Sequence, residues 1–80
     1  MKEKELIALG FKREDVNEDG YSFYYYTYDF KEDLCLISTD DGEAKKEGLF
    51  VYFFDHDHIW FSNPEDLKTL IDLIKRNTVR

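Results

Sequence analysis

The feature that most constrains this chain is the run Tyr21–Phe30, YSFYYYTYDF, in which only Ser22, Thr27 and Asp29 are not aromatic. Aromatic and β-branched side chains suit a pleated strand, and neither glycine nor proline interrupts the run, so it predicts a strand. Successive side chains of a strand point to opposite faces, and a strand with one face in water should alternate apolar and polar residues. This run is aromatic at both odd and even positions for about half its length, so one layer of helices cannot cover all of it.

Three further strands are predicted at residues 34–39, 49–54 and 58–61, with a turn at 31–33 before the first of them. The connections are short, which favours antiparallel neighbours because a parallel crossover needs about a dozen residues or more. Two polar segments are predicted to be connections: 12–20, which ends in the turn signal Asp-Gly, and 40–48.

Helices are predicted at both ends of this region. Residues 2–9 form the first, and Gly10 followed by Phe11 is typical of a left-handed helix end closed by a hydrophobic contact. Pro64 suits the first position of the second helix with Asn63 as its cap. The alternative is a capping box that spans Ser62 and Glu65. Apolar residues then recur with the period of one helix face: Leu67, Leu70, Ile71 and Ile74.

These elements predict an α+β fold of order αββββα, with a four-stranded antiparallel sheet, both helices on one face, and residues 1–80 in one domain. The expected core contains Leu6, Leu9, Phe11, Leu36, Leu67, Leu70, Ile71 and Ile74. On the aromatic strand the even positions stay aromatic to its end, so we expect Tyr24, Tyr26, Tyr28 and Phe30 to face the helices.

Composition limits the partners and the compartment. The chain is 42% hydrophobic and has fourteen aromatic residues, so we expect it to fold although 36% of its residues are charged. Its net charge of −7 opposes direct binding to nucleic acid or to anionic membranes. A basic protein partner is compatible with this charge. Cys35 is the only cysteine, and the apolar stretch 6–9 is too short for a signal peptide or a membrane span. We therefore expect a cytoplasmic protein.

Residues 15–20, DVNEDG, match the first half of a calcium-binding loop. Asp15, Asn17 and Asp19 would supply oxygen ligands, but the twelfth position, where a bidentate Glu is needed, is Tyr26. The alternative, which we favour, is a turn whose Asp and Asn side chains bond to their own backbone.

The string Asp55-His56-Asp57-His58 offers nitrogen and oxygen ligands to zinc or a similar ion. A structural zinc site needs four converging ligands, and a solvated hairpin turn explains the same string, so we favour the turn. Cys35 is expected to be a buried, inert thiol rather than a nucleophile paired with His56 or His58. No other catalytic motif is present, and we predict a protein that is not an enzyme and needs no cofactor.

Tyr21, Phe23 and Tyr25 are expected on the face of the sheet that the helices leave open, where they are candidates for an interface. The partner would be a second copy of the chain, giving a homodimer, or another protein. Two alternatives are that loops fold over these side chains, since tyrosine tolerates partial exposure, and that they stack RNA bases. The RNA alternative lacks the accompanying basic residues.

The first helix ending in Leu9-Gly10-Phe11, the tyrosine-rich strand and the closing helix that begins PEDLKTLI resemble small proteins of bacteriophages and bacterial mobile elements. Those proteins are largely uncharacterised, so the resemblance implies a genomic context and assigns no functional residue.

We expect a small, acidic, non-enzymatic binding or accessory protein that acts through protein–protein contact. One alternative is an acidic mimic of nucleic acid that inhibits a basic target protein. Binding by such a mimic should weaken steeply with salt, whereas association through apolar faces should not. A second alternative is a metal-binding domain that uses Asp55, His56, Asp57 and His58.

Overall fold

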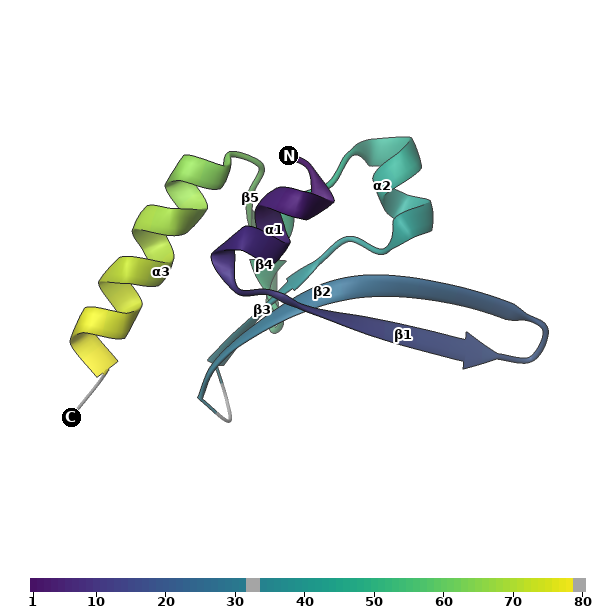
Figure 1. Cartoon of the computed structure of the whole chain (residues 1–80), viewed down its shortest axis with the longest axis horizontal. Coiled ribbons are helices and arrows are strands. Elements are labelled where there is room, and N and C mark those ends of the chain that lie inside the picture. The colour runs from purple at the N-terminus through teal and green to yellow at the C-terminus, as the bar shows by residue number, and fades with distance from the viewer. Residues whose placement is uncertain (32–33, 79–80) are drawn as a thin grey trace.

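The backbone forms a five-stranded antiparallel sheet with three helices (Figure 1). This computed structural model describes residues 1–31 and 34–78, and the side chains of Asp57 and Thr78 are outside the description. The strands, in sheet order, are β1 (Lys12–Glu18), β2 (Tyr21–Lys31), β3 (Leu34–Ser38), β4 (Val51–Phe53) and β5 (His56–Phe61). The helices are α1 (Glu3–Leu9), α2 (Asp41–Glu47) and α3 (Pro64–Thr78).

The predicted α+β class and antiparallel sheet are confirmed, and the predicted strands and helices correspond to β2–β5, α1 and α3. The predicted numbers, four strands and two helices, are wrong because β1 and α2 are also present. The turn predicted at 31–33 falls mainly on residues outside the description. No helix in the described ranges is long and apolar enough to cross a membrane.

The segment predicted as a connection at 12–20 is in fact strand β1 and its turn. β1 pairs with β2 from Lys12 opposite Thr27 to Glu18 opposite Tyr21. It is an edge strand, and charged side chains on an edge strand prevent pairing with other chains, so its polar sequence does not exclude a strand. The Asp-Gly turn has positive φ at both residues, +38° and +87°, as the two-residue turns that match strand twist require.

The segment predicted as a connection at 40–48 contains α2. Its start is a reciprocal capping box, in which Asp40 accepts a hydrogen bond from the Glu43 backbone N–H at 2.7 Å and Glu43 accepts one from the Asp40 N–H at 3.1 Å. None of its residues is buried, so α2 has no apolar stripe to reveal it in the sequence.

Part of β2 extends beyond the end of β3, and there side chains accept the backbone hydrogen bonds that a neighbouring strand would otherwise accept. Register with β3 begins only at Thr27. The backbone N–H of Tyr26 donates to the Ser38 Oγ at 2.9 Å, and that of Tyr24 donates to the Asp41 Oδ1 at 3.1 Å. The β1–β2 hairpin therefore projects from the rest of the sheet, as its long arm in Figure 1 shows.

The helix ends lie close to where the sequence predicts them. Gly10 is left-handed with φ of +105°, and Phe11 N–H donates to the Leu6 carbonyl at 3.0 Å, which closes α1. Asn63 caps α3, because its side-chain oxygen accepts from the Glu65 N–H at 2.8 Å.

The core lies between the sheet and helices α1 and α3. Its buried apolar residues are Leu6, Phe11, Tyr26, Leu36, Val51, Leu67 and Ile71. Five of the predicted core residues are among them, Leu9 and Leu70 are partly buried beside them, and Ile74 is half-buried. Val51 is absent from the prediction. The expected parity of β2 is confirmed, since Tyr26 is only 2% exposed and Tyr24, Tyr28 and Phe30 pack against the same core.

Candidate protein-binding face

The register of the strands shows which residues lie on the face of the sheet that points away from the core. Residues directly opposite each other in an antiparallel pair share a face. Thr27 lies opposite Ile37, Ile37 opposite Tyr52, and Tyr52 opposite Trp60, so one row of side chains crosses from β2 to β5. This row is on the side away from Tyr26, which neighbours Thr27 on β2.

Two aromatic arrays lie on this side. In the first, the rings of Tyr21, Phe23 and Tyr25 stack along β2 with centroids 6.2 and 6.4 Å apart. In the second, the Phe50 ring lies 6.3 Å from that of Tyr52 and 5.7 Å from that of Trp60. We call the two arrays together with Ile37 the aromatic face: Tyr21, Phe23, Tyr25, Ile37, Phe50, Tyr52 and Trp60.

The aromatic face is partly in solvent. Tyr21 is 61% exposed and Trp60 is 58% exposed, and the other five residues of the face are partly buried. Phe54 and Ile59, in the β4–β5 turn and on the edge strand β5, are also more than half exposed. Tyr, Trp and Phe are the residue types enriched at the centre of protein interfaces.

A groove of about 300 Å³ separates the two arrays. Its apolar walls are Val16, Phe23, Tyr25, Ile37 and Tyr52, and the carboxylates of Asp40 and Glu43 line it where β3 ends and α2 begins. Ser38 also lines it, but the Ser38 hydroxyl already accepts from Tyr26 and donates to the Thr39 carbonyl at 2.9 Å.

The interface candidates named from the sequence, Tyr21, Phe23 and Tyr25, do share one array. The sequence did not identify Phe50, Tyr52 and Trp60 as their neighbours. The signal for the second array was the segment 49–54, which is aromatic or aliphatic at both parities, with Val51 and Phe53 toward the core and Tyr52 on the aromatic face.

On the core side, one carboxylate joins α1 to β2. The hydroxyl of Tyr26 donates to the Glu3 Oε1 at 2.8 Å, and that of Tyr24 donates to the Glu3 Oε2 at 2.9 Å. Burial and then the bond to Glu3 raise the pKa of Tyr26 to about 12, and the bond to Glu3 raises the pKa of Tyr24. These bonds give the hydroxyls of Tyr24 and Tyr26 an acceptor within the fold.

The candidate calcium ligands do not lie in one loop, because Asp15 and Asn17 lie in β1 and Asp19 lies in the turn. The Asp15 carboxylate instead pairs with the Arg13 guanidinium at 3.0 Å. No group of three or more potential metal ligands occurs in the described part of the chain.

The hairpin turn predicted at 55–57 is present but shorter than predicted. Only Asp55 lies in the turn, and His56, Asp57 and His58 begin β5. The rings of His56 and His58 are exposed with centroids 6.5 Å apart.

Cys35 is a half-buried residue of β3, opposite Asp29 of β2. Burial, with smaller contributions from Asp29 and Asp55, raises the pKa of its thiol. A raised pKa disfavours the thiolate, which is the nucleophilic form of cysteine.

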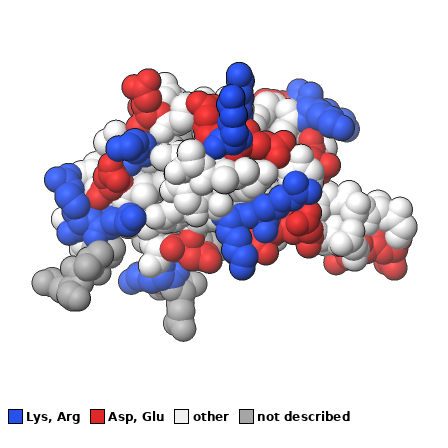
Figure 2. Space-filling view, viewed as in Figure 1, with Lys and Arg blue, Asp and Glu red and all other residues white. Residues whose placement is uncertain are grey.

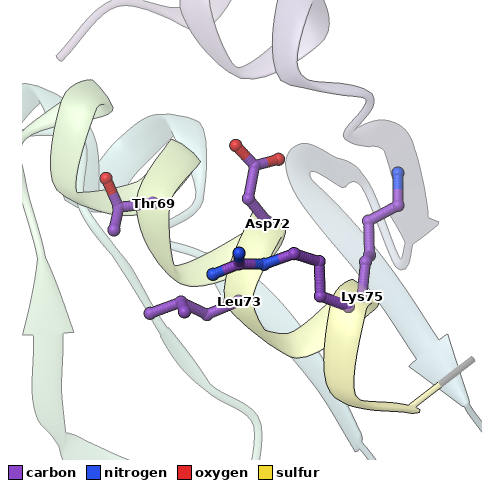
Figure 3. A pocket seen from close by; sticks show the side chains of 5 residues that line it. Thr69, Asp72, Leu73 and Lys75 are labelled. Atoms are coloured by element: carbon purple, nitrogen blue, oxygen red, sulfur yellow. The ribbon is translucent and has the colours of Figure 1, made fainter.

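A shallow depression on α3 is a weaker candidate for a binding site than the groove. Figure 3 shows that Thr69, Asp72, Leu73 and Lys75 all rise from this one helix, and Arg76 completes the lining. Asp72 already pairs with Lys68 at 3.4 Å, so the depression is the solvent side of a helix. Over the face of the molecule seen in Figure 2, acidic and basic side chains are intermixed around an uncharged centre.

No family model, no curated protein and no solved structure matches this chain.

Proposed function

We propose that this chain is a small, non-enzymatic binding protein that acts through protein–protein contact across its aromatic face. The observation that carries the proposal is the pair of ring stacks on the side of the sheet away from α1 and α3. A large aromatic side chain buries about 150–250 Å² when it passes from full exposure to full burial, and a standard interface buries about 800 Å² per partner. Tyr21 and Trp60 keep more than half of their area exposed, and the other four rings, already partly buried by the fold, add smaller areas. The six rings can therefore form the centre of such an interface, and residues around them must supply the rest.

Two further features support a role in association. The edge of β2 beside α2 is capped by Ser38 and Asp41, and β1 carries charged side chains along the other edge of the hairpin. The hydrogen bonds of Ser38 and Asp41 and the charges of β1 both oppose the addition of a strand from another chain at these edges. A partner would therefore contact the face of the hairpin rather than its edges.

The test is a crosslinking comparison between matched variants in a lysate of the source cell. Tyr21→Ser removes an exposed ring from the aromatic face, and Leu73→Ser removes an exposed side chain from the outer side of α3. We expect the same defined crosslinked protein with the unaltered chain and with Leu73→Ser, and its loss with Tyr21→Ser. Equal crosslinking by all three proteins would overturn the proposal.

The other hypotheses stay predictions. The acidic-mimic alternative predicts that binding of a basic target falls steeply between low and high salt. The metal alternative predicts a stoichiometric metal in the untagged protein, which elemental analysis measures. The phage-related context and the cytoplasmic location are likewise predictions from the sequence.

A further inference from the structure

The groove between the two aromatic arrays combines two kinds of group that suit the same ligand. Its lining includes the aromatic residues Phe23, Tyr25 and Tyr52 and the acidic residues Asp40 and Glu43. Aromatic faces attract cations through the negative charge of their π clouds, and carboxylates attract them by charge and hydrogen bonding.

We infer that this groove binds an arginine side chain presented by a basic protein partner. The inference rests on the proposed function, because it specifies the chemistry of the partner that the aromatic face meets. Arginine fits better than lysine, since its planar guanidinium stacks on rings and also pairs with carboxylates. The volume of about 300 Å³ lies at the lower end for ligand cavities, which suits one inserted side chain.

The carboxylates keep the capacity to accept a cation. Asp40 and Glu43 each accept one backbone hydrogen bond of the α2 capping box. A carboxylate has two oxygens and about four acceptor positions, so each retains unused positions. Within the described residues, neither carboxylate forms an ion pair.

The local charge favours a cation despite the helix beside the groove. The N-terminal end of a helix carries roughly +0.5 of an elementary charge, and α2 presents that end here. Asp40 and Glu43, which line the groove, offset it with two carboxylates, whereas Asp41 lines a separate pocket beside Tyr24 and α1. Glu14 lies on the groove's side of the sheet, opposite Tyr25, and adds a third carboxylate. Lys12 shares this side but is at the β1 end of the row, beyond Thr27 from the groove.

The test uses two small probes that differ in charge: N-acetyl-arginine methylamide and its uncharged isostere N-acetyl-citrulline methylamide. Nuclear magnetic resonance shifts are followed at the Ile37 methyl groups and the Tyr52 ring, with the Leu73 methyl groups on α3 as an internal control. We expect the arginine probe to shift Ile37 and Tyr52 saturably, with a Kd of about 1–10 mM, and the citrulline probe to bind at least about fivefold more weakly.

Matched variants isolate the carboxylates. Asp40→Asn and Glu43→Gln keep side-chain oxygens for the capping box while each removes one charge. Each should weaken the arginine probe by about two- to fivefold, whereas Asp72→Asn on α3 should leave its Kd unchanged. Unfolding midpoints measured beside the titrations show whether the cap is intact.

Three results would overturn the inference: equal binding of the two probes, no saturable shift up to tens of millimolar, or a dimer whose interface already covers Ile37. The last would assign the groove to a second copy of the chain. A failed probe titration leaves the crosslinking result with Tyr21→Ser unaffected, so failure of the arginine site and failure of the proposed function are distinguishable.

Discussion

Tyr26 carries most of the connection between the aromatic strand and the first helix. Its ring is buried in the core, its hydroxyl donates to Glu3 and its backbone N–H donates to Ser38. Each of these contacts gives a stability test.

The first test is the pH dependence of unfolding. The pKa of Tyr26 is raised to about 12, so the unfolded chain releases this proton first, near its ordinary pKa of about 10. The stability contributed by the protonated phenol is therefore complete below pH 10 and is lost as the pH rises from 10 to 12. Between pH 9 and 11 the loss from this group is about 1.3 kcal/mol. Urea denaturation should show that loss in the unaltered protein, and Tyr26→Phe should lack it. Parallel pH profiles would contradict the assignment.

The second test concerns Ser38, which is 2% exposed. Ser38→Ala leaves the Tyr26 N–H without its acceptor in a buried place, and this should lower the free energy of unfolding by about 1–3 kcal/mol. Ser22→Ala makes the same chemical change at an exposed position of β2 and should alter stability by less than about 0.5 kcal/mol. If both variants lost the same stability by chemical denaturation, the role given to Ser38 would be wrong.

At the scale of elements, two glycines with opposite backbone requirements test the hairpin and α2. Gly20 has φ of +87° in the β1–β2 turn, and an added Cβ there meets nothing within 4 Å. Gly20→Ala should therefore cost about 1–2 kcal/mol from the backbone alone. Gly42 lies in the first turn of α2 without a positive φ, and an added Cβ would meet the Asp40 Oδ1 at 3.4 Å, an ordinary contact distance. Gly42→Ala should therefore stabilise the protein by about 0.5–1 kcal/mol. Thermal unfolding measures the change in stability of each variant, and changes of the same sign in the two variants would contradict these assignments.

The elements that the sequence did not predict share one property: few apolar side chains. β1 is a strand because it pairs with β2, and its own sequence has only one apolar residue. An edge strand of a protruding hairpin needs little apolar surface, so no alternating pattern marks it. α2 is held by the Asp40 and Glu43 capping box, a signal visible in the sequence but weak without an apolar stripe. Strongly patterned elements, such as α3 with its apolar stripe and Asn63 cap, were predictable because burial and capping agree there.

At the scale of the molecule, half of the candidate site could be predicted. The parity of β2 assigns Tyr21, Phe23 and Tyr25 to one face by local geometry alone. The groove required the register of β3 and β4 and the placement of α2, which bring Ile37, Tyr52 and the carboxylates to the same place. Such non-local pairing is not encoded in the spacing of any single segment.

A comparison of two neighbours on β2 tests directly whether the aromatic face binds a protein. Tyr25 lies on the aromatic face and Tyr26 lies in the core. Tyr25→Ser should abolish the crosslinked association and leave unfolding cooperative with a small loss of stability, whereas Tyr26→Ser should cost about 3–5 kcal/mol in the free energy of unfolding. Equal losses of stability for the two variants, with association unchanged in Tyr25→Ser, would contradict the account and return the aromatic face to ordinary structural packing.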